Sequence, residues 1–180
     1  VILDALKNVT LEEARKRLFV IARKIGNSWS DDEKRKLSKL CMSQISAEIS
    51  GFSITGGPKI STNIQAIYTL GICRSMDHLS KLSALHSNSR YLQACLYTHA
   101  KTRSDLQWIQ DEFEADAKKS LKLAGNNIQF SAYAIGIALR KSDSGTELLS
   151  SSARGKIVKN MCNIIISGKL SEEALTSCIL

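Results

Sequence analysis

Proline occurs once in this 180-residue chain, at Pro58, and this scarcity limits the folds that the chain can adopt. A β-sandwich or β-barrel needs turn residues about every ten positions, and one proline with ten glycines is too few for that pattern. Hydrophobic residues make up 43% of the sequence, so the chain can bury a core. We therefore predict a single all-α domain over residues 1–180.

Helix start and stop signals recur along the chain. Thr10, followed three residues later by Glu13, predicts an N-cap for a helix that runs to Ile25. Ser30 and Glu33 repeat this capping pattern for a helix that stops at Gly51, and the stretch 51–61 has the composition of a loop. Further helices are predicted from Ile60 to Cys73, from Leu79 to Leu85, from Ser89 past His99, from Ser104 or Asp105 to Gly125, from Ile128 to Leu139, over 146–166 and from Ser171.

The arrangement of these helices is predicted from their number and short connections. Periodicity alone also allows a buried strand at 128–139, but the length and alanine content of that stretch favour a helix. About eight or nine antiparallel helices fit a helical bundle or a short α-solenoid of helix-turn-helix repeats. Within the domain, residues 1–51 would form a basic helical pair and residues 60–180 a helical array.

The cysteines indicate the redox state of the compartment. They are odd in number, widely spaced and placed in apolar helical segments, whereas a disulfide framework or a zinc site needs clustered cysteines. We therefore predict buried free thiols in a reducing, intracellular compartment. These cysteines are Cys41, Cys73, Cys95, Cys162 and Cys178.

No group of residues in the sequence specifies a reaction. Cys95 and His99 have the spacing of two ligands on one helix face, but no second pair accompanies them, so we interpret both as core residues. The loop at Gly57-Pro58-Lys59 does not match a phosphate-binding loop, because Pro58 separates the glycine from the lysine and lacks an N–H donor. We predict a protein that is not an enzyme and that holds no cofactor and no metal.

The first residue and the length of the apolar runs indicate whether the chain is a processed form and whether it enters a membrane. The sequence begins at Val1 with neither an initiator Met nor a signal-peptide pattern, which predicts a fragment or a processed form. No apolar run approaches the roughly 18 residues of a membrane span, so no membrane partner is expected.

The net charge of +8 is the remaining functional signal. Half of it lies in residues 1–60, where 11 Lys plus Arg face seven acidic residues. Basic side chains on the two helices there could form one positive surface that holds RNA phosphates by counterion release, or a solubilising face. Trp29 and Trp108 are candidates for stacking on bases. The predicted nucleic-acid-binding residues are Arg15, Lys16, Arg17, Arg23, Lys24, Lys34, Arg35, Lys36 and Lys39.

An apolar sequence pattern recurs in three of the expected helices. Its copies align Tyr68, Tyr97 and Tyr133 at steps of 29 and 36 residues. The copies Tyr68-Thr69-Leu70-Gly71 and Tyr133-Ala134-Ile135-Gly136, each followed by a second helix, resemble the helix pairs of the octotricopeptide and heptatricopeptide class of organellar RNA-binding repeats. The resemblance covers residues 60–140. It implies an α-solenoid whose concave face contacts single-stranded RNA, often in mitochondria or plastids.

These features together predict a helical RNA-binding protein or ribonucleoprotein component whose basic helix surfaces contact phosphates. Its expected partners are RNA, single-stranded or structured, and other proteins of a complex, in the mitochondrion or otherwise in the cytoplasm. One alternative is a helical scaffold for protein–protein interaction, with the charge serving solubility or an acidic partner. Another is a viral nucleoprotein or other structural protein, which would also be basic and helical.

Overall fold

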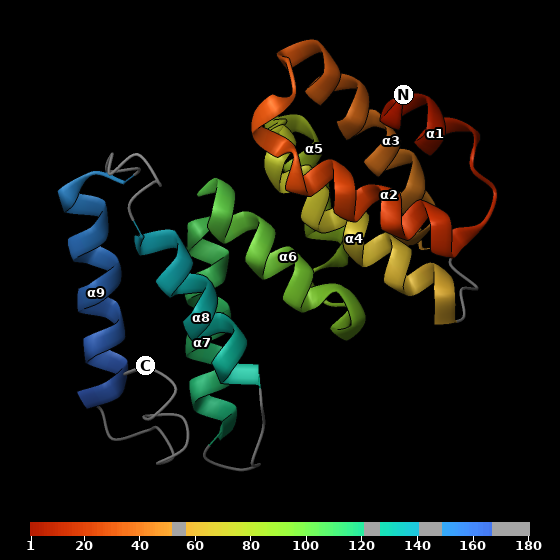
Figure 1. The fold of residues 1–180 in the computed structure, drawn as a ribbon. Coiled ribbons are helices and arrows are strands. Elements are labelled where there is room, and N and C mark those ends of the chain that lie inside the picture. The colour runs from red at the N-terminus through yellow and green to blue at the C-terminus, as the bar shows by residue number, and fades with distance from the viewer. Residues whose placement is uncertain (52–56, 121–126, 141–148, 167–180) are drawn as a thin grey trace. The chain divides into compact units, whose positions relative to one another are not determined.

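The computed structural model describes residues 1–51, 57–120, 127–140 and 149–166 (Figure 1). Over these residues it contains nine α-helices, two short 3-10 helices and no strand, which confirms the predicted all-α class. Contacts divide the chain into two compact units, Val1–Thr98 and His99–Leu180, and each is described by itself. The boundary falls inside a helix, not in the segment 51–60, where the sequence suggested a sub-division.

The first unit holds most of the described helices. Its elements are α1 (Ile2–Asn8), α2 (Glu12–Lys24), η1 (Gly26–Ser28), α3 (Asp31–Ile49), α4 (Gly57–Cys73), α5 (Met76–Ser80), η2 (Lys81–Leu85) and most of α6 (Ser89–Thr102). The second unit holds the end of α6, α7 (Leu106–Ser120), α8 (Asn127–Leu139) and α9 (Ser151–Ile166). No described helix is long and apolar enough to cross a lipid bilayer.

Helix α4 packs against both α2 and α3 and supplies the centre of the first unit. Its side chains Ile67 and Leu70 are fully buried. On α3 the buried apolar residues repeat every four positions, at Leu37, Cys41 and Ile45, as expected for an amphipathic helix that covers a core. One face of α3 therefore covers the core of the first unit.

The capping box predicted at the start of α3 is present. The Oγ atom of Ser30 accepts a hydrogen bond from the Glu33 backbone N–H at 3.3 Å, and the Glu33 carboxylate accepts one from the Ser30 N–H at 2.9 Å. Both bonds satisfy N–H groups that a helix N-terminus leaves without partners.

The prediction that Thr10 caps the next helix upstream is wrong. Helix α2 begins at Glu12, and its N-cap residue is Leu11, whose backbone is extended and whose side chain forms no capping bond. Arg15 donates to the Val9 carbonyl oxygen and thereby ties the start of α2 to the end of α1. The helix α1 itself was not predicted, because its seven residues carry no side-chain cap and are too few to show a period.

Helix α4 starts at Gly57, three residues earlier than predicted, so the expected loop 51–61 is shorter than the sequence suggested. Pro58 is the second residue of this helix, where the missing proline N–H costs nothing because the first turn has no acceptor for it. Proline there begins a helix and does not mark a loop.

In the second unit, α7 packs against α8. Ala134 and Ala138 of α8 are buried, and the segment is a helix as predicted. The guanidinium of Arg103 donates to the carbonyl oxygens of Ile137 at 3.4 Å and Arg140 at 3.0 Å, which satisfies acceptors at the C-terminal end of α8. The predicted helix end at Gly125 and the helix predicted from Ser171 lie outside the described residues.

The thiol prediction holds in part. Cys41 and Cys95 are buried, Cys73 is half-buried, and all are free thiols. Burial raises the pKa of Cys95 to about 12. Cys162 is exposed, so the prediction that it is buried is wrong: it lies on the outward side of α9, most of whose described side chains are exposed. Cys178 lies outside the described residues.

Candidate nucleic-acid interface

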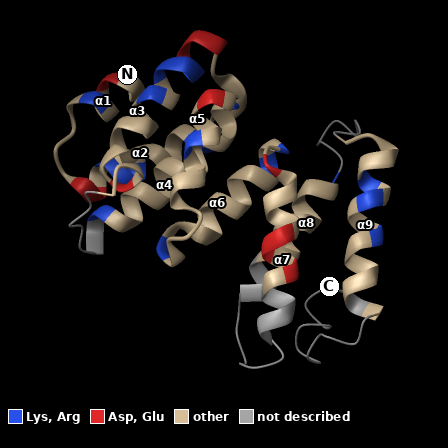
Figure 2. Ribbon diagram, turned by 180° about the vertical axis from the view of Figure 1, so that it is seen from behind, with Lys and Arg blue, Asp and Glu red and all other residues tan. Residues whose placement is uncertain are grey.

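The nine basic residues predicted to bind RNA all lie on α2 and α3 of the first unit. Figure 2 shows acidic segments next to basic ones on these helices. The structure divides the nine residues into three kinds. One is built into the fold, four form ion pairs with acidic residues of their own helix, and four have no ion pair within the described parts of the chain.

Arg15 is the residue that is built into the fold. Its half-buried guanidinium donates to the Gln44 side-chain oxygen at 3.2 Å, to the Glu12 carboxylate at 3.3 Å and to the Val9 carbonyl oxygen. These bonds join α1, α2 and α3. Most of its donors are therefore used within the protein.

Four basic residues pair with carboxylates three or four positions earlier, which is the spacing that brings side chains together on a helix. The Nζ or Nε to carboxylate distances are 3.1 Å for Lys16–Glu13, 3.3 Å for Arg17–Glu13, 3.9 Å for Lys34–Asp31 and 2.6 Å for Lys36–Asp32. The hydrogen bond from Lys36 and its charge lower the pKa of Asp32. Each pair reduces the positive field that a phosphate would meet there.

The remaining four basic residues, Arg23, Lys24, Arg35 and Lys39, have no ion pair among the described residues. Lys39 on α3 acts through its charge on His78 of α5. Burial lowers the pKa of His78, and the charges of Lys81 and Lys39 lower it further. The Asp77 charge on α5 opposes both lysines, so the positive charge of this region is partly compensated.

Three neighbouring side chains combine positive charge with aromatic rings. The Arg23 guanidinium lies over the ring of Tyr68, 5.1 Å from its centroid. The Tyr68 and Tyr97 rings meet edge to face, with centroids 5.2 Å apart and planes at 90°. The three residues come from α2, α4 and α6 in turn, and all belong to the first unit (Figure 1). We call Arg23, Tyr68 and Tyr97 the tyrosine ladder.

Each ladder tyrosine is followed by a buried threonine that bonds to the preceding helix of the ladder. The Thr69 hydroxyl group shares its hydrogen between the Gln65 carbonyl oxygen of its own helix at 2.7 Å and the Phe19 carbonyl oxygen of α2 at 3.2 Å. Thr98 donates to the Ile67 carbonyl oxygen of α4 at 3.0 Å. These bonds set the position of each helix against the one before it. In each Tyr-Thr pair, the threonine therefore positions the helix that carries the tyrosine ring.

The ladder is partly open to solvent. Arg23, Tyr68 and Tyr97 are each half-buried. Burial raises the pKa of Tyr68, and the Arg23 charge opposes this effect without cancelling it. Tyr68 is therefore a neutral phenol near pH 7, whose ring can pack against another planar group.

The third aligned tyrosine differs from the first two. Tyr133 on α8 is 58% exposed and is followed by Ala134, which has no hydroxyl group to donate. Gly71 lies 3.7 Å from the Thr98 methyl group, as measured from an added Cβ, whereas Gly136 has no neighbour within 4 Å. The Tyr-Thr arrangement therefore characterises two of the three copies.

The prediction that Trp29 stacks on bases does not fit its burial. Trp29 is 8% exposed, and its Nε1–H donates to the Ala22 carbonyl oxygen at 2.8 Å, so it closes the turn between α2 and α3. Trp108 of the second unit is half-buried, with its Nε1–H bonded to Glu112 at 3.2 Å.

The tyrosines were recognised in the sequence as repeat markers and missed as a site. The dipeptide Tyr-Thr, repeated 29 residues apart, was the signal that could have identified them.

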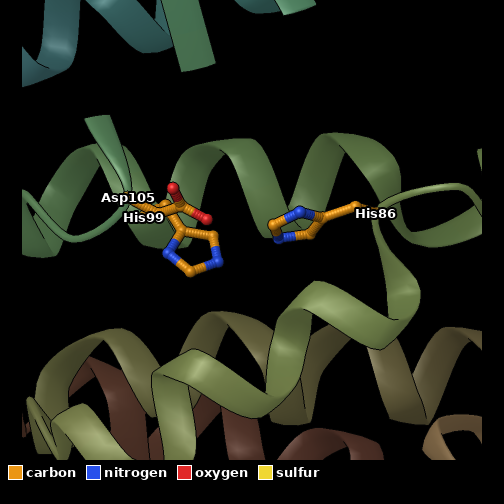
Figure 3. Close-up of side chains that lie close together, drawn as sticks. All are labelled: His86, His99 and Asp105. Atoms are coloured by element: carbon orange, nitrogen blue, oxygen red, sulfur yellow. The ribbon is translucent and has the colours of Figure 1, made fainter. Parts of the chain in front are cut away.

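His99 is a buried histidine of the second unit, next to Asp105 in Figure 3. Its Nδ1 shares a hydrogen bond of 2.8 Å with the Ser104 hydroxyl group, and its ring meets Trp108 edge to face. Burial lowers its pKa, although the Asp105 charge opposes this. His86, also labelled there, belongs to the first unit. The two residues of the second unit offer fewer donor atoms than a zinc site needs.

Comparison with known proteins adds no relative, since no family model, no curated protein and no solved structure matches this chain.

Proposed function

We propose that this protein binds single-stranded RNA through the tyrosine ladder of its first unit, as a non-enzymatic component of a ribonucleoprotein. The observation that carries the proposal is the continuous contact of Arg23, Tyr68 and Tyr97 at a partly open surface. Every base has a π-face, so aromatic rings beside cations can hold single strands without reading a sequence.

The charges beside the ladder suit this role. Arg23 adds a cation to the stack, and Lys24 follows it at the exposed end of α2. Neither has a carboxylate partner within the described residues. Cations of this kind release counterions from a nucleic acid, which makes the affinity fall as salt rises. The paired residues Lys16, Arg17 and Lys36 contribute less.

The free thiols agree with a reducing intracellular compartment, with the mitochondrion as one candidate. The other proteins of such a complex are expected partners of the chain.

The test is fluorescence anisotropy with a labelled single-stranded RNA of mixed sequence, at several salt concentrations. Tyr68→Leu and Tyr97→Leu keep an apolar side chain and remove the ring, and each is expected to weaken binding about 5- to 150-fold, the loss of one stacked base. Tyr68→Phe keeps the ring and should bind like the wild type. Tyr133→Leu, at the third aligned position, is the matched control and should have no effect.

Circular dichroism of each variant separates a lost contact from a lost fold. Arg23→Gln should reduce the slope of log affinity against log salt, whereas Lys16→Gln should change it little because Lys16 is paired with Glu13. Undetectable RNA binding at low salt would refute the proposal. Folded leucine variants that bind as tightly as the wild type would also refute it.

A protein-interaction scaffold is the second candidate. Ile21 and Ile25 of the first unit are 45% and 38% exposed and lie four positions apart along α2 and its C-cap, where a partner helix could cover them. This function predicts a complex with another protein that survives high salt, whereas an RNA complex would dissociate there.

A further inference from the structure

The first unit contains a cavity of about 330 Å³ that shares no residue with the tyrosine ladder. It lies between α1, α2, α3 and the start of α4. Arg15 at the cavity and Arg23 in the ladder are eight positions apart on α2, or about 12 Å along the helix axis at 1.5 Å per residue. A ligand of the cavity would therefore not occupy the ladder.

The lining of the cavity carries more positive than negative charge. Lys7, Arg15 and Lys59 line it together with one acidic residue, Glu12. One oxygen of the Glu12 carboxylate accepts the bond from Arg15, and the other is buried with no hydrogen-bond donor among the described residues. The negative charge of Glu12 is thus paired with Arg15, and Lys7 and Lys59 leave the lining with a net positive charge. Lys7 and Lys59 have no ion pair within the described chain, so their ammonium groups are available.

The N-terminal ends of two helices beside the cavity also favour an anion. Glu12 is the first residue of α2 and Lys59 the third residue of α4, so two helices begin beside the cavity. The N-terminal end of a helix carries partial positive charge and favours an anion. Leu6 and Phe19 supply an apolar part of the lining, and Ser43 and Ser46 supply hydroxyl groups.

We infer that this cavity binds a small organic phosphate, with the phosphate group at Lys7 and Lys59 and the body of the molecule against the apolar and hydroxyl lining. The volume is in the lower part of the range of small-molecule sites and exceeds what a bare phosphate ion needs. Sugar phosphates and mononucleotides share this chemistry. The inference goes beyond the proposed RNA binding and does not depend on it.

Isothermal titration calorimetry of the full chain tests the inference, with ribose 5-phosphate and AMP as probes. At least one of the two probes is expected to bind. The one that binds more tightly shows whether the cavity prefers a sugar phosphate or a mononucleotide. Ribose, which lacks the phosphate, should not bind. Lys7→Ala and Lys59→Ala should each weaken binding about tenfold or more, as expected when a bond to a charged group is lost. Lys16→Ala, on α2 but outside the cavity lining, should bind like the wild type.

Lys7 and Lys59 bond to no described residue, so their substitution is not expected to unfold the protein, and thermal unfolding checks this. Tyr68→Leu should leave the binding of ribose 5-phosphate unchanged, and because this probe has no base to stack on the ladder, it keeps this test separate from that of the ladder. The inference fails if neither organic phosphate binds, or if inorganic phosphate binds as tightly as both of them. It also fails if both lysine variants bind like the wild type.

Discussion

Thr69 and Thr98 show how two hydroxyl groups can place an aromatic site. Each follows a ladder tyrosine and lies within hydrogen-bond distance of a carbonyl oxygen of the preceding helix, although Thr69 also donates to Gln65 of its own helix. A shift of α6 against α4 would break the Thr98 bond and separate the rings. A buried hydroxyl group that lost its acceptor would also carry a desolvation cost. The geometry of the ladder therefore depends on residues that do not touch a ligand.

Replacing Thr98 with valine tests this dependence. Thr98→Val keeps the shape of the side chain and removes the bond to Ile67, which should lower the free energy of unfolding by about 1 kcal/mol. Urea denaturation followed by circular dichroism measures the change. Thr10→Val, at an exposed position, is the control and should be neutral. Equal stability of both variants would contradict the role assigned to Thr98.

His99 makes stability depend on pH. Burial lowers its pKa below the ordinary value of 6.5, so the unfolded chain binds the proton more readily than the folded protein. The free energy of unfolding should therefore fall as pH falls from 6.5 through the folded pKa, and this contribution should stop changing below it. An NMR titration of His99 measures the folded value directly. A midpoint at or above 6.5 would contradict the prediction.

Helix α3 and helix α2 show what a sequence can predict about the start of a helix. Ser30 and Glu33 make the capping box that their spacing predicts. At Thr10 the same spacing occurs, but α2 begins at Glu12 with Leu11 as its N-cap, and Arg15 ties the start of the helix to Val9 at the end of α1. That contact joins residues whose proximity depends on the fold, so a local pattern could not reveal it.

Paired substitutions at the two caps check this difference. Ser30→Ala should cost about 1 kcal/mol of stability, since it removes the acceptor for the Glu33 N–H, and Thr10→Ala should cost almost nothing. The bonds from Ser30 lower the pKa of Glu33 below 4.5. The advantage of the wild type over Ser30→Ala should therefore shrink as pH falls through that lowered value. Urea denaturation at a series of pH values measures both effects, and an equal loss in both alanine variants would contradict them.

For the whole molecule, charge is distributed unequally between the two units. Residues 1–98 carry 14 Lys plus Arg against eight acidic residues, or +6, and residues 99–180 carry 11 against nine, or +2. The tyrosine ladder lies in the more basic unit. The excess positive charge and the tyrosine ladder thus both point to residues 1–98 as the part of the chain that binds RNA under the proposed function.

Ultraviolet cross-linking to single-stranded RNA, with the linked peptides identified by mass spectrometry, should map to residues 1–98. Peptides that contain Tyr68 or Tyr97 should dominate, because a stacked base lies in contact with the ring. The peptide that contains Tyr133 serves as an internal control. Cross-links found mainly in residues 99–180 would place the RNA elsewhere and contradict the prediction.

The sequence predicted the helical class and most helix positions, because apolar periodicity and caps are local. It predicted the candidate site less well. Counting charges marked Lys16, Arg17 and Lys36 as binding residues, and the structure pairs each of them with a carboxylate at helical spacing, which a charge count leaves out. The contact between Tyr68 and Tyr97 joins two helices, so it depends on packing that spacing along the chain cannot specify.

The two groups joined by each threonine bond of the ladder are synthesised in a fixed order. In both cases the hydroxyl group belongs to the later helix and the carbonyl oxygen to the earlier one. During synthesis the acceptor therefore leaves the ribosome before its donor. Helix α4 can join α2, and α6 can then join α4, without waiting for any part of the chain still to be made, so this part of the protein can assemble in the order in which it is translated.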